Sequence, residues 1–271
     1  MNLLARSCLG LVTSVWLALV PVGVQAAAPN AAAAPVSYDP RDLTGFWVST
    51  QSPYTNAESY GRAVRLMRPD LKDYPVTNPE DYPNRHPPLP IRYTPEFEAL
   101  HKKIQADYDA GKPYRTGYMC QPNGLLFAII TNQSFEILSA PGRLLFFREN
   151  IGTLWHVYFD RPLKKEFMSP ELFGDSVGRW EGDTLVVEST NLGGHAVVVE
   201  TEPYSQSLHV VQRIRRPTYD TLTVDIVADD KRAWLEPLKF HVTYRLDNKR
   251  EFDEYQCWDD GGGKRMEFAP E

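Results

Sequence analysis

The sequence predicts an all-β fold, an antiparallel barrel or curled sandwich with one peripheral helix. After Cys120 the chain consists of short apolar runs with two-residue alternation, separated by turn residues at intervals typical of an antiparallel meander. So many sequential strands have to close on themselves or stack as two sheets, because exposed edges invite aggregation. Residues 42–271 are long enough to form a single β-rich domain with a sizeable core.

The first 26 residues have the pattern of a cleavable export signal. Arg6 precedes an apolar run over 9–24, and Val24-Gln25-Ala26 offers the small residues of a cleavage site. The run is shorter than the roughly twenty residues of a membrane-spanning helix, so we expect a periplasmic or secreted protein without stable membrane insertion. An uncleaved anchor is the alternative. The Ala- and Pro-rich segment 27–41 is then a flexible leader.

The charge and the motifs exclude several classes of function. The formal charge of −6 becomes −7 once residues 1–26, with one basic and no acidic residue, are removed. Such an acidic chain argues against a nucleic-acid partner, which needs a basic face. The sequence contains no His-Glu-x-x-His, Cys-x-x-Cys, Walker or Gly-x-Ser-x-Gly motif. We therefore expect no cofactor and no metal site.

Two cysteines remain after export, Cys120 and Cys257. An even number of cysteines in an exported protein predicts a disulfide. It would close a loop of 257 − 120 + 1 = 138 residues, which the chain-entropy model values at about 4 to 5 kcal/mol. The alternative is a metal-binding or nucleophilic thiol.

The part before the meander combines a Pro-rich segment with the one predicted helix. Prolines recur through 51–92 and deny the backbone ladder hydrogen bonds, which indicates a surface excursion. A helix is expected over about 95–110, with Thr94 as N-cap and Pro95 at the first helical position. Its apolar stripe consists of Phe97, Leu100, Ile104 and Tyr108.

The strands of the meander follow from the two-residue alternation and the turns between them. Turns are expected at 140–142, near 150–152 and at 181–183, where Gly142 and Gly182 can supply positive φ. The predicted strands are 125–130, 134–139, 144–149, 153–159, 177–180, 184–190, 197–200, 208–216, 221–228, 239–246 and 251–258.

A further strand begins at Thr44, and Gly45-Phe46-Trp47 within it resembles the Gly-x-Trp opening of lipocalin-type calycin barrels. The resemblance implies that the indole closes the base of a barrel and that an arginine stacks on it; Arg245 and Arg250 are the candidates. The Thr-Asp-Tyr turn of that family is missing here. A simple core anchor is the alternative for Trp47.

Longer segments resemble a widespread family of uncharacterised exported bacterial proteins. These are 176–188, with Gly-Arg-Trp-Glu-Gly-Asp at its centre, 208–216, and the two cysteine-bearing segments 120–124 and 254–257. The likeness spans most of 42–258. It implies export and a common fold, and it transfers no catalytic residue.

Five residues are candidates for proton-transfer chemistry. His156 lies in a strand that is apolar on both faces, where a shielded imidazole could move a proton or merely bond to a carbonyl. His209 and Arg213 share one strand face, which points either into a barrel or to solvent. Glu188 has the same two alternatives, and Asp175 is either a partner of the histidine or a turn residue.

These patterns lead to two main functional hypotheses. A cavity lined by Trp155, Tyr158, Phe146 and Trp180 would suit an apolar or aromatic small molecule. In the first hypothesis it is a cofactor-independent lyase, dehydratase or isomerase site, where His156 or His209 moves the proton, Asp175 or Glu188 orients it and Arg213 stabilises an oxyanion. In the second, the cavity only binds and carries its ligand, and a purely structural envelope protein is a third possibility.

Overall fold

The structure is a computed structural model that describes residues 36–53, 57–70, 89–110, 124–131, 133–148, 153–164, 171–193, 198 and 201–252. The elements below belong to one unit, Ser37–Glu271. The proposed export signal and both cysteines of the predicted disulfide lie outside the described residues. So do all but one residue of the expected strand at 197–200 and most of that at 251–258.

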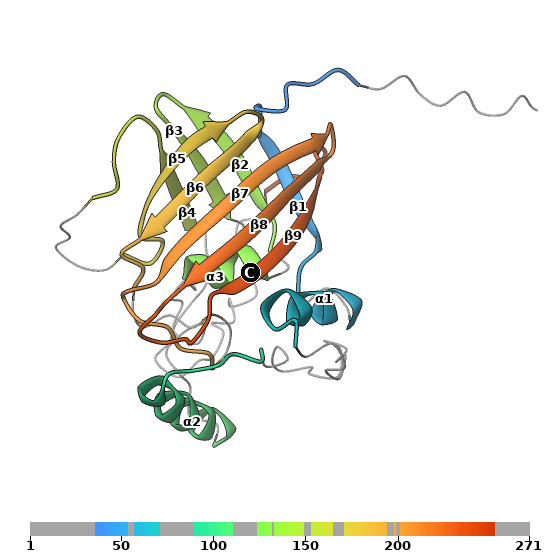
Figure 1. The fold of residues 1–271 in the computed structure, drawn as a ribbon. Helices are drawn as coiled ribbons and strands as arrows, with labels where there is room; N and C mark the ends of the chain where they lie inside the picture. The colour runs from blue at the N-terminus through green and yellow to red at the C-terminus, as the bar shows by residue number, and fades with distance from the viewer. Residues whose placement is uncertain are drawn as a thin grey trace, which may run out of the picture. The chain divides into compact units, whose positions relative to one another are not determined.

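The described part of the chain contains nine strands that form one closed barrel (Figure 1). Each strand pairs with the next in sequence, and the last pairs with the first, which confirms the predicted barrel over the curled sandwich. The strands are β1 (Gly45–Gln51), β2 (Phe135–Ala140), β3 (Arg143–Arg148), β4 (Thr153–Tyr158), β5 (Asp175–Glu181), β6 (Thr184–Thr190), β7 (His209–Thr218), β8 (Thr221–Asp229) and β9 (Leu238–Leu246).

One pair of neighbouring strands, β4 and β5, is parallel, whereas all other neighbours are antiparallel. Strand directions alternate around an antiparallel barrel, so a barrel with an odd number of strands needs one parallel pair to close. Here Tyr158 is in register with Val177. Gly178 lies at this seam: a Cβ on it would be 2.9 Å from Phe159 Cε1 and 2.9 Å from Val157 Cγ1.

Alternation along the strands places mostly apolar residues inside the barrel and most of the charged residues outside. On β7 the buried side chains are Val210, Gln212, Ile214 and Arg216. On β8 and β9 they are Leu222, Val224, Ile226, Ala228, Leu238, Phe240, Val242 and Tyr244. The expected turns at 140–142 and 181–183 are confirmed, with positive φ at Gly142 (72°) and Gly182 (60°).

Trp47 is fully buried, and an arginine accompanies it as the calycin resemblance implied. Its indole Nε1 donates to the Leu43 carbonyl over 2.9 Å. The arginine is Arg216, whose guanidinium carbon lies 5.4 Å from the indole centroid. The prediction of Arg245 or Arg250 was therefore wrong, because Arg245 points outward and Arg250 lies over the ring of Phe46. Arg216 is inward because it continues the buried alternation of β7.

The helices differ from the prediction in number and place. The expected helix is confirmed as α2 (Pro95–Asp109), with Phe97 and Ile104 buried and Leu100 exposed. The Thr94 hydroxyl does not cap it but donates to the Arg232 carbonyl over 2.7 Å. The Pro-rich segment, expected to be a surface excursion, contains a second helix, α1 (Ala57–Met67), which packs against β9.

The predicted strand 125–130 is wrong, because this segment forms the short helix α3 (Leu125–Ile130). A short apolar run has no periodicity that separates a buried strand from a buried helix. All side chains of α3 except Phe127 are buried. It lies beside β9 (Figure 1), where the Tyr244 hydroxyl donates to the Ile129 carbonyl over 2.9 Å. Within the described residues, no helix has both the length and the apolar character needed to cross a membrane.

Candidate functional site

The inner wall of the barrel is apolar except for a small set of polar side chains. Register and burial place the polar members on all but two of the strands: Ser49, Arg148, Thr153, Ser176, Ser189, Gln212, Arg216 and Tyr244. The inward positions of the nine described strands carry neither a histidine nor a carboxylate. The wall can therefore donate and accept hydrogen bonds but offers no ordinary general base.

A short hydrogen-bonded chain crosses three strands on this wall. The indole Nε1 of Trp155 on β4 donates to Ser176 Oγ on β5 over 2.8 Å. The hydroxyls of Ser176 and Ser189 on β6 are 2.7 Å apart. All three side chains are buried. This chain satisfies the tryptophan and ties β4 to β6 across the parallel seam.

Three other inward polar atoms have no hydrogen-bond partner among the residues that the structure describes. They are Ser49 Oγ, Arg148 Nε and Gln212 Nε2, all buried. In folded proteins the large majority of buried polar atoms have a partner, either within the protein or in bound water. Three buried polar atoms without partners among the described residues are therefore an unusual feature of this barrel interior.

Arg148 is the most unusual of the three. It ends β3 and is only 3% exposed, and its side chain makes one hydrogen bond to the described residues, from Nη2 to Gln133 Oε1 over 2.7 Å. No ion pair in the described part of the chain includes it. Burial lowers the pKa of its guanidinium to about 10, and the nearby Tyr244 opposes that shift.

Aromatic rings border Arg148 along the wall. Phe135, in register with Arg148, has its ring centroid 4.7 Å from that of Tyr244 and 5.6 Å from that of Phe146. Phe146 in turn lies 4.4 Å from Trp155. The predicted ligand-binding residues Phe146 and Trp155 are thus inward and in contact.

The other two predicted ligand-binding residues are placed differently. Trp180 occupies an inward position, because it is in register with inward Leu185, but its side chain is only half-buried. The guanidinium carbon of Arg41 lies 5.4 Å from the centroid of its ring. Tyr158 faces outward, because Trp155 and Val157 occupy the inward positions of β4. Arg161 lies 4.3 Å over the outward ring of Tyr158.

His156 also faces outward and does not reach the barrel interior. Its ring is stacked on that of Tyr158 with 5.8 Å between centroids, and its Nδ1 is buried without a partner. Burial, and then the charge of Arg143, lower the pKa of this imidazole. The sequence left its direction open because β4 is apolar on both faces. The structure places it on the outer face by parity with Trp155.

Glu188, His209 and Arg213 share the outer face of neighbouring strands, so the inward alternative for them was wrong. Glu188 Oε1 accepts from Arg179 Nη1 over 2.5 Å, and its Oε2 lies 3.8 Å from His209 Nε2. Arg213 Nη1 donates to Glu181 Oε2 over 2.9 Å. The three predicted residues are between 30% and 47% exposed, as ordinary cross-strand partners on a surface are.

Asp175 is buried but belongs to a different arrangement from the one expected. Both of its oxygens accept from Arg161, and the Lys164 backbone N–H donates to it over 2.8 Å. Burial raises the pKa of Asp175, and the bonds from Arg161 and Lys164 outweigh burial, so that the net pKa is lowered. The carboxylate fastens the segment after β4 to the start of β5. The five predicted catalytic residues do not converge on one site.

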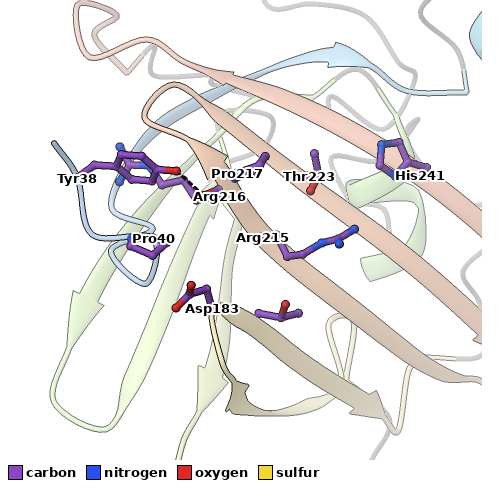
Figure 2. A pocket seen from close by; sticks show the side chains of 9 residues that line it. Tyr38, Pro40, Asp183, Arg215, Arg216, Pro217, Thr223 and His241 are labelled. Atoms are coloured by element: carbon purple, nitrogen blue, oxygen red, sulfur yellow. Dashed lines mark hydrogen bonds between the residues drawn. The ribbon is translucent and has the colours of Figure 1, made fainter. Parts of the chain in front are cut away.

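A pocket that the sequence did not indicate lies on the outside of the barrel (Figure 2). It has a volume of about 450 Å³ and lies between the N-terminal residues Tyr38 and Pro40 and the outer faces of β7 to β9. Its other lining residues are Asp183, Thr184, Arg215, Arg216, Pro217, Thr223 and His241. Two of these residues contact Asp225: Arg215 Nη2 donates to Asp225 Oδ2 over 2.6 Å, and His241 Nδ1 lies 2.6 Å from Asp225 Oδ1.

Comparison with known proteins identifies no family for this chain. No protein-family model matches it, and no curated protein sequence matches it. Among solved structures, the chain is similar to a secretary abundant heat soluble (SAHS) protein from Ramazzottius varieornatus, with 10% identity. The alignment covers 53% of this chain and 85% of that chain, with a TM-score of 0.27. A similarity at this level carries no argument about function.

Proposed function

We propose that the barrel interior binds a small, largely apolar molecule, and that the protein carries or stores this molecule rather than transforming it. One observation carries the proposal: buried polar atoms without partners among the described residues, on Ser49, Arg148 and Gln212, face into a closed and mostly apolar barrel. Barrels of about this strand number are just wide enough to be filled by side chains or to hold one small ligand. Buried polar groups without partners favour a barrel that holds a ligand over one that is filled by its own side chains.

The make-up of the inner wall favours binding over catalysis. A lyase or isomerase of the kind considered above needs a positioned acid or base within hydrogen-bonding distance of its substrate. The two histidines considered for that role face outward, and the described strands offer no inward carboxylate. The aromatic rings and the few hydrogen-bonding groups are what a carrier needs to hold a ligand in one orientation.

Export is part of this proposal and rests on the sequence of residues 1–26. A cleaved signal would place the barrel in the periplasm or outside the cell, without stable membrane insertion. In that compartment a carrier shields an apolar compound from water. The Cys120–Cys257 disulfide remains a prediction that fits the same compartment.

A fluorescence titration with N-phenyl-1-naphthylamine, an uncharged apolar probe, tests the proposal. We expect saturable binding at one site. Gln212→Leu, inside the barrel on β7, should change the dissociation constant several-fold, whereas His209→Gln, on the outer face of the same strand, should leave it unchanged. Absence of saturable binding, or an equal response to both substitutions, would contradict an interior binding site.

A turnover assay addresses the enzyme alternative. The probe recovered after incubation with the protein should be chemically unchanged, and so should any compound extracted from protein purified in its native state. His156→Gln and His209→Gln should alter neither binding nor recovery. Conversion of an extracted compound that stops with either substitution would restore the lyase or isomerase hypothesis.

A further inference from the structure

We infer that the bound molecule is an organic acid with an apolar body, and that Arg148 pairs with its single negative charge. This inference rests on the proposed function and specifies the ligand class of the same site. It starts from the charged side chains that the fold buries. A charge removed from water is costly unless it is paired and hydrogen-bonded.

Arg148 differs in this respect from the other deeply buried charges of the described residues. Those are Asp175, Glu202, Arg216 and Asp230. Each has two or more hydrogen bonds: Asp175 from Arg161 and Lys164, Glu202 from the N–H groups of Leu89 and Thr201, Arg216 to the carbonyls of Asp42 and Tyr219, and Asp230 from Ser205. Arg148 has one, to a neutral amide.

The guanidinium therefore has N–H donors in the interior of the barrel that no described residue accepts. It offers five N–H groups in a planar fork that suits the two oxygens of a carboxylate or sulfonate. Gln133 engages Nη2, and Nε has no partner. An acid group supplied by a ligand would meet both the hydrogen-bonding and the charge requirement. A bridging water would meet only the first.

The surroundings of Arg148 define the rest of the ligand. Phe135 and Phe146 lie along the wall next to it, followed by Trp155. Ring faces of this kind favour a flat or chain-like apolar body. The other inward cation, Arg216, is engaged by backbone carbonyls and by aromatic rings including Trp47. One available positive charge suits a monoanion better than a doubly charged phosphate.

Two fluorescent probes that differ by one sulfonate test the inference. They are 8-anilinonaphthalene-1-sulfonate and its uncharged parent, N-phenyl-1-naphthylamine. Arg148→Met should weaken binding of the sulfonate probe by between about tenfold and a hundredfold, the worth of a charge-assisted hydrogen bond in a dry site. It should change binding of the uncharged probe by less than about threefold. Arg148→Lys, which keeps the charge and loses the fork, should be intermediate.

A matched control separates the local interaction from net charge. Arg213→Met removes the same side chain and the same charge from the outer face of the barrel and should leave both affinities unchanged. Thermal melting of each variant verifies that it is folded. If the uncharged probe binds and Arg148→Met leaves the sulfonate affinity unaltered, the acid-binding inference fails while the proposed function stands. If neither probe binds the wild-type protein, both fail.

Discussion

Removal of Arg148 should stabilise the ligand-free protein. Folding lowers the pKa of this guanidinium from its ordinary value to about 10, chiefly because the group is buried. The folded state therefore binds the proton less tightly than the unfolded chain does. At neutral pH both states are fully charged, and the difference corresponds to a penalty on the fold of about 3 kcal/mol. This penalty decreases only as the pH rises above about 10, the pKa of the folded state.

The net effect of Arg148→Met follows from two opposing contributions. The substitution removes the charge penalty and also the hydrogen bond to Gln133, which is worth about 1 kcal/mol. The expected gain is about 2 kcal/mol. For a domain of this size, 1 kcal/mol shifts the melting temperature by about 2 to 4 °C. Arg148→Met should therefore melt about 4 to 8 °C above the wild type.

Arg216→Met is the matched control for this experiment. Arg216 is 5% exposed, similar to Arg148, but its guanidinium donates to the carbonyls of Asp42 and Tyr219 and lies over Trp47. Its removal leaves buried acceptors without donors and should lower stability by about 3 kcal/mol or more. Both variants lose one positive charge, so calorimetry at pH 7 on protein stripped with hydrophobic resin compares local effects. Destabilisation by Arg148→Met comparable to that by Arg216→Met would refute the reasoning, because it would mean that Arg148 is a satisfied structural residue.

Three further substitutions test other parts of the fold. Gly178→Val should destabilise the barrel by about 2 kcal/mol or more in urea unfolding, because its Cβ would clash with Phe159 and Val157 at the parallel seam; unaltered stability would mean that β4 and β5 are not so closely packed. Asp175→Asn should cost about 3 kcal/mol at neutral pH. Because folding lowers the pKa of Asp175, the ionised carboxylate stabilises the fold fully above pH 3.8, and this stabilisation is lost as the pH falls through the folded pKa. The free energy of unfolding of Asp175→Asn should therefore change less with pH below about pH 4 than that of the wild type. The same pH dependence in both proteins would argue against the ion pair between Asp175 and Arg161. Trp155→Phe, which removes the donor to Ser176, should lower the melting temperature by about 2 to 6 °C, and no change would show that the indole bond is not formed.

Much of the barrel follows from local chemistry that is visible in the sequence. The strand at 184–190 has the predicted bounds, and those of β8 and β9 differ from prediction by one residue. Two-residue alternation and the turn glycines Gly142 and Gly182 were sufficient there. The prediction was wrong at 125–130, where all side chains are apolar and show no alternation, and it missed α1 in a segment dominated by its prolines.

The candidate site was predicted only in part. Phe146 and Trp155 face inward, as the cavity hypothesis requires, whereas Tyr158 and both candidate histidines face outward. Arg148 was missed, although it continues the parity of Leu144 and Phe146 along one strand. That parity was a usable signal. A charge at the end of an apolar face is ordinarily interpreted as the point where a strand reaches solvent.

The sequence by itself determined which residues share a face, because the period of a strand is a local property of the backbone. The tertiary structure decided which face is the inside, which pair of strands is parallel, and which arginine accompanies Trp47. These depend on closure, which brings together residues far apart in the chain. The burial of Arg148 without a counter-charge among the described residues also depends on closure, because it requires that none of the strands around Arg148 supplies a carboxylate.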